Sequence, residues 1–396
     1  KALEAGGPYQ LQITGKDNQI SIKDILIGDV WLCSGQSNMQ WVVNNVTNAE
    51  VEKKNANYSQ IRTLNIPRRM ELSPKDTIST TWLVCSPETV GRFSGVAYFF
   101  ARKVYEETNI PIGIINSSWG GTIVETWTSL EAANTLPQKR LDRYNKNEKL
   151  SPPTEYFTRT NKEAKRNDYP SLVYNAMIHP LLSFAIKGVV WYQGENNVGN
   201  AEPYTDWLTC MISDWRNRWN SELPFYIIQL PNFDSTNKTP LWAEIRDAQR
   251  KVLTVPKTHL IVTSDLGDPR DLHPRNKQEV GMRVALQVLH HEYGRPDIVS
   301  ESPMFERMEI NGDKIIITFK NTGSGLEIRS RYGCLQGFTI AGEDKKFYWA
   351  QGELKDNRIV IWNPKVPNPI AVRYNWENNP DGNLYNKDGL PACLFR

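Results

Sequence analysis

The feature that most constrains the fold of this chain is an alternation of two patterns between residues 28 and 294. Short apolar runs have the length of buried strands, and they are Val30–Cys33, Ile61–Ile66, Ile112–Asn116, Gly188–Tyr192, Phe225–Leu230 and His259–Thr263. Between these runs, apolar residues recur at helical spacing, for example over 97–104, 207–219 and 280–288. Strands that alternate with helices are typical of a parallel sheet covered on both faces. We therefore predict an α/β fold.

The segments on either side of this region have a different pattern. Residues 10–27 alternate polar and apolar positions around a turn at Gly15–Asn18, which predicts a hairpin. From about residue 300 strand-like runs return, two of them joined by an Asn311-Gly312 turn. We expect three parts: residues 1–27 as the end of an N-terminal β domain that begins before Lys1, 28–294 as the α/β domain, and 295–396 as a C-terminal β segment.

One part of the α/β region departs from the alternation. Residues 134–170 are polar, charged and contain proline, with weak periodicity. Long segments without regular structure inside a domain are commonly functional. We interpret this excursion as a lid over the sheet or as a wall of a substrate site.

Composition excludes several classes of function. The 47 basic and 44 acidic residues are interspersed, without a basic block that could follow a phosphate backbone, so we expect no nucleic-acid partner. No apolar stretch approaches the ~20 residues of a membrane-spanning helix. The chain has 13 tryptophans, and tryptophan is more often a core residue than a ligand contact. The five cysteines have no metal-ligand spacing, and we expect no metal or other cofactor.

The serine at position 37 is a candidate nucleophile. It follows the strand Val30–Cys33 and Gly35, and ligands of parallel sheets bind at the carboxyl ends of strands. At the start of a helix its N–H is available for a developing oxyanion. The alternative interpretation is that Ser37 only caps the following helix.

A catalytic serine requires a base, and the chain has only five histidines. His273 follows the strand His259–Thr263 through a polar turn and precedes Pro274, a residue favoured at the first position of a helix. It is therefore expected at the same sheet edge as Ser37, near acidic residues. Of the other four, we interpret His290 and His291 as solvated at a helix end and His259 as structural. The context of His179 is not informative.

Two glycine-containing turns follow other predicted strands. Residues 118–122 follow Ile112–Asn116, and residues 191–197 run on from Gly188–Tyr192. Glycine lets backbone N–H groups approach a ligand closely, although it often only makes a tight turn. Together with Ser37 and His273 these turns predict one polar site at one edge of the sheet.

Five segments carry a family resemblance. They are Gly28-Asp29-Val30-Trp31-Leu32-Cys33-Ser34-Gly35-Gln36-Ser37-Asn38-Met39, Trp119-Gly120-Gly121-Thr122, Trp191-Tyr192-Gln193-Gly194-Glu195, Leu272-His273-Pro274-Arg275-Asn276-Lys277-Gln278 and the closing run 383–392. In this order they resemble the sialate O-acetylesterase family of the SGNH (GDSL-like) hydrolases, which is related to acetylxylan esterases. The resemblance covers nearly the whole chain. It implies a flavodoxin-like parallel sheet covered by helices, with flanking β-sandwich-like segments.

The resemblance also implies roles for matched positions. Ser37 would attack an acetyl carbonyl, and His273 would take its proton and later return it to the sugar oxygen. The oxyanion would be held by the Ser37 N–H, by an N–H of Gly120 or Gly121, and by the side-chain amide of Gln193, which stands where many SGNH enzymes carry asparagine. Candidate substrate contacts are Asn38, Trp119 and Glu195.

The third member of the triad departs from the family pattern. Many SGNH hydrolases have aspartate three residues before the catalytic histidine, and here that position is Arg270. Asp271 is favoured, because a residue two positions away projects to a similar side in an extended loop. Asp268, a backbone carbonyl or no third member are the alternatives.

The expected function is hydrolysis of O-acetyl esters on a sugar through a Ser-His acyl-enzyme mechanism. Sialic acid is the favoured substrate. A xylan deacetylase with the same residues and an inactive carbohydrate-binding relative are the alternatives. Acetylated glycans are extracellular or vesicular, so a secreted, periplasmic or lysosomal setting is expected. The sequence does not indicate an oligomeric state.

Overall fold

The centre of the chain is a seven-stranded sheet in the computed structural model, which describes residues 3–146, 148–151, 168–234 and 239–396. In spatial order its strands are β5 (Trp82–Cys85), β4 (Tyr58–Asn65), β6 (Ile112–Ser118), β3 (Asp29–Gly35), β7 (Gly188–Tyr192), β8 (Phe225–Ile228) and β9 (Thr258–Ile261). All neighbours are parallel except the edge strand β5, which is antiparallel to β4. The order β6-β3-β7-β8-β9 is the flavodoxin-like order, with β4 and β5 added outside β6. The predicted α/β fold is confirmed.

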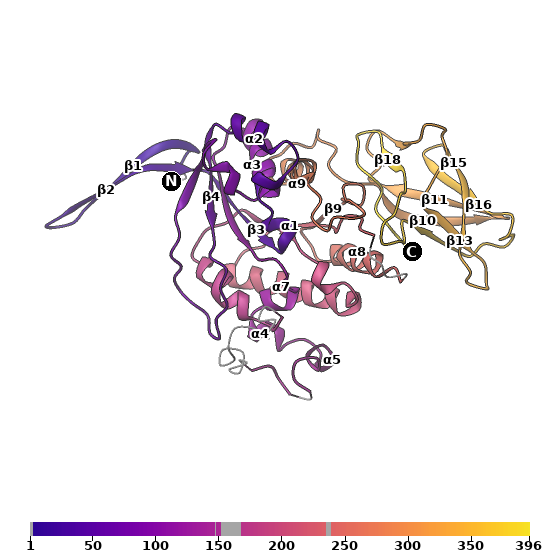
Figure 1. Cartoon of the computed structure of the whole chain (residues 1–396), viewed down its shortest axis with the longest axis horizontal. Coiled ribbons are helices and arrows are strands. Elements are labelled where there is room, and N and C mark those ends of the chain that lie inside the picture. The colour runs from indigo at the N-terminus through magenta and orange to yellow at the C-terminus, as the bar shows by residue number, and fades with distance from the viewer. Residues whose placement is uncertain (1–2, 147, 152–167, 235–238) are drawn as a thin grey trace.

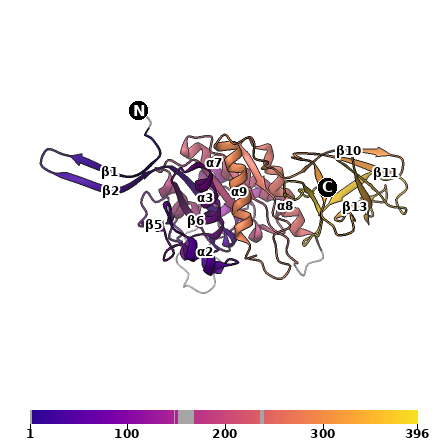
Figure 2. The ribbon, with the colours of Figure 1, turned by 90° about the horizontal axis from the view of Figure 1, so that it is seen from above.

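Helices cover both faces of this sheet (Figure 1). On one face, α3 (Gly95–Thr108) packs along α9 (Lys277–Glu292), as Figure 2 also shows. On the other, α7 (Ala201–Trp219) packs against α8 (Leu241–Lys251). The tryptophan stripe of α7 faces the core as predicted, since Trp207 and Trp215 are buried.

Side-chain caps determine where two of these helices begin. Ser94 accepts a hydrogen bond from the Ala97 N–H at the start of α3. Asn276 caps α9 in the same way through the Glu279 N–H. The helix after His273 therefore begins at Lys277, later than the start at Pro274 that the proline signal indicates.

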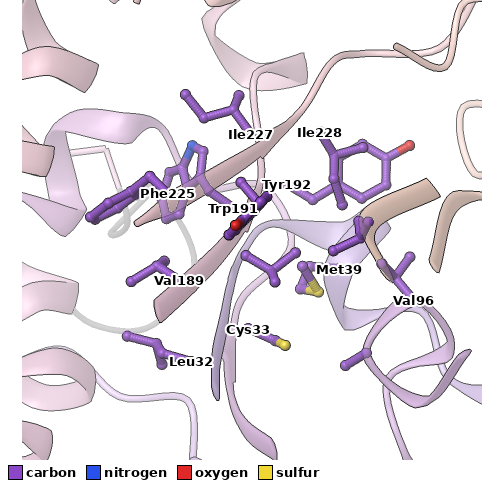
Figure 3. Close-up of a cluster of buried hydrophobic side chains, with 14 of the residues drawn as sticks. Leu32, Cys33, Met39, Val96, Val189, Trp191, Tyr192, Phe225, Ile227 and Ile228 are labelled. Atoms are coloured by element: carbon purple, nitrogen blue, oxygen red, sulfur yellow. The ribbon is translucent and has the colours of Figure 1, made fainter. Parts of the chain in front are cut away.

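Apolar side chains of β3, β7 and β8 form the centre of the larger core (Figure 3). Leu32, Val189 and Phe225 come from these three strands, and each is fully buried. Cys33 lies among them, and burial raises the pKa of its thiol. Because strands buried on both faces read as continuous apolar runs, their positions were predictable.

A hairpin and a group of short sheets lie at opposite ends of the molecule (Figures 1 and 2). The hairpin consists of β1 (Gly6–Thr14) and β2 (Gln19–Ile27), joined at the predicted turn. At the other end are the sheets β10-β11-β16-β15, β14-β13-β17 and β12-β18. Their bounds are β10 (Met304–Asn311), β11 (Lys314–Lys320), β12 (Leu326–Ile328), β13 (Phe338–Ala341), β14 (Tyr348–Trp349), β15 (Gln351–Lys355), β16 (Arg358–Trp362), β17 (Ala371–Tyr374) and β18 (Leu384–Asn386).

The C-terminal sheets enclose a second apolar core, with Ile317, Phe338 and Ile361 among its members. The chain also returns to the first core, because Trp376 and Leu394 belong to the cluster of the α/β region. Arg246 of α8, fully buried, donates hydrogen bonds to the carbonyl oxygens of Glu377 and Asn378. The C-terminal strands are therefore fixed to the α/β region by apolar packing and by a buried guanidinium.

Short helices occupy the loops between the larger elements. They are α1 (Ser37–Gln40), η1 (Val43–Asn45), α2 (Ala49–Asn55), η2 (Val90–Arg92), η3 (Val124–Trp127), α4 (Leu130–Ala133), α5 (Gln138–Leu141), η4 (Tyr174–Ile178), η5 (His179–Leu181), η6 (Glu195–Asn197) and η7 (Val252–Thr254). Of the predicted excursion at 134–170, residues 147 and 152–167 lie outside the described residues. Among the described residues, no helix is both long and apolar enough to cross a membrane.

Candidate active site

The loops after β3, β6 and β7 meet at the carboxyl edge of the sheet. The Gln36 N–H donates to the Tyr192 carbonyl (3.0 Å), and the Trp119 N–H donates to the Gly35 carbonyl (3.0 Å). β3 lies between β6 and β7, and the chain passes from it first to one side and then to the other. Such switch points are where open α/β sheets bind ligands.

Gly35 brings the candidate nucleophile into this position. Its φ is +133°, and a Cβ there would lie 2.1 Å from the Tyr192 carbonyl oxygen, so only glycine fits between the two strand ends. Ser37 follows as the first, partly exposed residue of α1. The position before the helix is Gln36, which makes no side-chain cap. The alternative that Ser37 is only a helix cap is therefore wrong, and as the first helical residue it has no intrahelical acceptor for its N–H.

The Gly120–Gly121 turn lies directly over Ser37. A Cβ at Gly120 would be 3.2 Å from the Ser37 Cβ, and Gly121 has a φ of +78° that favours glycine. The Gly120 N–H donates to Oε1 of Gln40 (2.8 Å). An oxyanion bound by the Gly120 N–H would displace Oε1 of Gln40 as its acceptor. The predicted juxtaposition of Ser37 with the turn after β6 is present.

Gln193 is at the predicted sheet edge, but its amide is fully buried. Its Nε2 donates to Oε1 of Gln36 (3.0 Å), to the Thr122 carbonyl (3.1 Å) and to Oδ1 of Asn197 (2.7 Å). These contacts favour a role in holding the turn after β7, and its donation to an oxyanion stays a prediction.

The exposed amide in this turn belongs to Asn196, which the sequence analysis did not single out. Its Nδ2 donates to the Gly121 carbonyl, next to the turn over Ser37. The signal was present in the run Glu195-Asn196-Asn197, because several amides follow one strand. Which of them faces outward depends on buried partners that the sequence does not show.

His273 lies on the loop between β9 and α9, stacked on Trp41. The two ring centroids are 4.9 Å apart and the ring planes differ by 9°. Within the described residues, Nε2 of His273 is buried without a hydrogen-bond partner. Burial and the Lys277 ammonium lower the pKa of His273, and the Asp271 carboxylate opposes them. The ring is therefore kept neutral, as a general base must be.

Both candidate acids shape the loop before His273. Oδ1 of Asp271 accepts the backbone N–H of His273 (2.8 Å). Oδ1 of Asp268 accepts the backbone N–H of Arg270 (2.8 Å), and that aspartate is exposed. The favourable charge interaction with the ring comes from Asp271. A bond from its carboxylate to the ring stays a prediction, with Asp271 favoured over Asp268.

Asn38 and Glu195 lie beneath the surface rather than on it. Asn38 is fully buried and Glu195 is 8% exposed. Nδ2 of Asn38 donates to Oε1 of Glu195 (2.5 Å) and to the Leu272 carbonyl (3.0 Å), and its Oδ1 accepts from Nζ of Lys277 (2.5 Å). These contacts do not favour substrate binding by either residue. Trp119 is half-buried at the site and remains a candidate substrate contact.

The other histidines have partners outside this group of residues. Nδ1 of His179 contacts the Lys75 carbonyl (3.0 Å), and Nδ1 of His290 contacts the Ile298 carbonyl (2.9 Å). His259, His291 and Glu301 form the one group of possible metal ligands found among the described residues, with ligand atoms within 4.8 Å of one another. They come from β9, the end of α9 and the segment before β10, so sequence spacing did not indicate the group.

Comparisons with known proteins identify the family of this chain. Residues 27–290 match the family of sialic acid-specific acetylesterases, described as carbohydrate esterases. Sialate O-acetylesterases of Homo sapiens and Pongo abelii are each 33% identical over 349 residues, which is 79% of this chain and 63% of theirs. The chain thus spans somewhat less than two thirds of the length of these curated relatives.

A solved structure gives the same result. The carbohydrate acetylesterase of Xanthomonas citri superimposes with a TM-score of 0.89 at 36% identity, covering 100% of this chain and 86% of that one. The four segments that hold the candidate site residues all lie within the matched residues 27–290. The chain belongs to the family of sialic acid-specific carbohydrate acetylesterases.

Proposed function

We propose that this chain hydrolyses O-acetyl esters of a sugar through an acyl-enzyme on Ser37, with His273 as the base. The observation that carries the proposal is the convergence of three groups at one sheet edge. Ser37 begins α1 beneath the Gly120–Gly121 turn, and His273 stacks on Trp41 at the other end of the same short helix. Family membership and the acetylesterase from Xanthomonas citri support the same reaction class.

The reaction has two balanced steps. Oγ of Ser37 attacks the acetyl carbonyl carbon while His273 takes its proton, and the tetrahedral oxyanion then collapses. The sugar oxygen leaves with the proton from His273, and the acetyl group stays on Ser37. His273 then takes a proton from water, whose oxygen attacks the acetyl-serine, and delivers that proton to Oγ of Ser37 as the acyl bond breaks. Acetic acid leaves and loses its remaining proton to the solvent.

The oxyanion is stabilised by backbone N–H groups of Ser37 and of the Gly120–Gly121 turn. Asn196 supplies the third donor, because its exposed amide lies beside that turn while the Gln193 amide is engaged with buried acceptors. Asp271 holds the loop and offsets the charge that His273 acquires.

Sialic acid is the favoured substrate because of the positive charge near the base in the sequence. Arg270 and Arg275 flank His273 and are both exposed. Within the part of the chain that the structure describes, neither guanidinium has an ion pair. Sialic acid carries a carboxylate that arginine binds well, whereas the xylose units of acetylxylan are neutral. A secreted, periplasmic or lysosomal setting follows from this substrate.

The mechanism is tested with Ser37→Ala and His273→Ala, assayed on p-nitrophenyl acetate and on an O-acetylated sialic acid. Both variants are expected to lose hydrolysis while remaining folded. The matched controls are Ser34→Ala, whose buried hydroxyl has no hydrogen-bond partner in the described structure, and His179→Gln. Undiminished turnover by folded Ser37→Ala would refute the mechanism.

Two further measurements separate the alternatives. A fluorophosphonate probe labels an activated Ser37 but not an inactive carbohydrate-binding relative, and labelling is expected to disappear in Ser37→Ala and to persist in Ser34→Ala. Acetate release from acetylated sialoside and from acetylated xylan is compared next. Faster release from xylan would replace the sialic-acid assignment and leave the Ser37 mechanism intact.

A further inference from the structure

A buried polar chain lies directly under the two proposed catalytic residues. Its central member is the side chain of Asn38, which is fully buried next to Ser37. One Nδ2 hydrogen goes to the Leu272 carbonyl (3.0 Å) and the other to Oε1 of Glu195 (2.5 Å), while Oδ1 accepts from Nζ of Lys277 (2.5 Å). Every hydrogen of this amide is therefore used within the protein.

Opposite charges on either side fix the orientation of the amide. Lys277 is fully buried, and Glu195 nearly so. If the Asn38 amide turned over, its NH2 would face the Lys277 ammonium and its oxygen would face the Glu195 carboxylate. Both contacts would be repulsive, and the bond to the Leu272 carbonyl would be lost. Buried charges are costly unless they are paired and hydrogen-bonded, so removal of one member leaves the other charge less well compensated.

The chain joins the two segments that carry the reaction. Asn38 directly follows Ser37 on α1, and Leu272 directly precedes His273 on the loop before α9. Lys277 is the first residue of α9, so that helix begins at the same contact. We propose that Lys277, acting through Asn38 and Glu195, is a positioning residue that holds Ser37 and His273 in register. The inference rests on the proposed function.

The charges around His273 determine the sign of the effect. Lys277 faces it from α9 and Asp271 from its own loop, and the neutral Trp41 follows the last residue of α1. Arg270 and Arg275, near it in the sequence, are exposed. Lys277 lowers the pKa of His273, and Asp271 raises it. Burial lowers the pKa of Lys277 to about 7 against the opposing pull of Glu195 and Asp271. Lys277 is therefore charged on the acidic side, where protonation of His273 limits the rate.

The experiment compares Lys277→Met with Lys277→Arg in the whole chain, following kcat and KM for p-nitrophenyl acetate as a function of pH. Lys277→Met is expected to lower kcat about 10- to 100-fold, the effect of losing a hydrogen bond from a charged group, with little change in KM. Its acidic limb is expected to move to higher pH by roughly half a unit to one unit. Lys277→Arg keeps the charge, so its acidic limb is expected to stay in place even where kcat falls.

The matched control is Lys187→Met. Lys187 pairs with Asp29 (3.3 Å) and lies over the Tyr293 ring, as Lys277 lies over that of Tyr192. Asp29 is at the opposite end of β3 from Ser37, so this change is expected to leave kcat and the pH profile as in the wild type.

A second variant keeps the inference testable if Lys277→Met does not fold. Asn38→Ala removes the bond to Leu272 and leaves Lys277 and Glu195 free to pair with each other. It is expected to lower kcat about as much while moving the acidic limb little. Wild-type kcat in folded Asn38→Ala, or an unchanged profile in folded Lys277→Met, would overturn the inference. Failure of the proposed function is distinguishable, because the wild type would then lack activity that depends on Ser37.

Discussion

The stack of His273 on Trp41 gives a quantitative prediction about the base. Replacing Trp41 by leucine removes an aromatic face whose ring plane is 9° from that of His273, with the centroids 4.9 Å apart. Such aromatic contacts contribute about 0.5–1.5 kcal/mol beyond area burial. If this energy holds the imidazole in its reactive orientation, Trp41→Leu lowers kcat/KM about 2- to 13-fold.

The same change has a second effect with a defined sign. Burial is the largest cause of the lowered pKa of His273, and the indole supplies part of that burial. Opening the ring to water raises the pKa of His273 toward its ordinary value. Because His273 acts in its neutral form, the acidic limb of kcat/KM is expected to move to higher pH in Trp41→Leu.

The assay is kcat/KM for p-nitrophenyl acetate from about pH 5 to pH 8, where histidine titrates, with thermal unfolding to confirm that each variant is folded. Trp41→Phe is the matched comparison, since it keeps a stacking ring but loses the bond from Nε1 to the Asn45 carbonyl (3.1 Å). Near wild-type values are expected for Trp41→Phe. Equal losses in both variants would assign the effect to the indole N–H, and no change in Trp41→Leu would refute the reasoning.

Four further predictions concern other parts of the site and the fold. Gly35→Ala places a Cβ 2.1 Å from a backbone oxygen at a φ of +133°, and is expected to lower the free energy of unfolding in urea by about 3 kcal/mol or more; an unchanged midpoint would contradict the close approach. Asn196→Ala is expected to lower kcat about 10²- to 10³-fold, because the variant lacks one donor to the oxyanion. A wild-type kcat in this variant would show that another group is the third donor. Arg275→Ala is expected to raise KM for O-acetylated sialic acid but not for p-nitrophenyl acetate, whereas equal effects on both would exclude a contact with the carboxylate. Burial lowers the pKa of His259 from 6.5 to about 4, so the unfolded state takes up a proton first as the pH falls. The free energy of unfolding is therefore expected to decrease by about 3 kcal/mol as the pH is lowered from 6.5 to 4. His259→Phe should remove that part of the acid sensitivity, as measured by urea unfolding at both pH values.

The parallel strands could be predicted, but one edge strand and one helix could not. β7 has the predicted bounds Gly188–Tyr192, because a strand buried on both faces is a continuous apolar run. β5 was not predicted, because an edge strand with an exposed Trp82 does not form a continuous apolar run. α8 was not predicted, because its buried face includes Arg246 and Gln249, which interrupt the helical spacing of apolar residues.

The candidate site divides in a similar way. The placement of Ser37, Gly120 and His273 on loops at one edge of the sheet was predictable, because loops after parallel strands meet there. Their chemical roles stay predictions. The orientation of side chains was not, since it depends on distant partners. Nε2 of Gln193 reaches Gln36 across 157 positions, and Lys277 reaches Asn38 across 239. Local pattern carries no information about such contacts.

The bond from Arg246 to the Glu377 carbonyl spans 131 positions, and it has a consequence for how the chain is synthesised. During translation α8 leaves the ribosome long before the segment between β17 and β18 that accepts hydrogen bonds from this guanidinium. Until residues 376–394 emerge, the guanidinium lacks its acceptors and the apolar surface later covered by Trp376 and Leu394 is open to solvent. The nascent α/β layer is therefore expected to associate with chaperones late in synthesis, and to become resistant to protease only after the C-terminal strands have emerged.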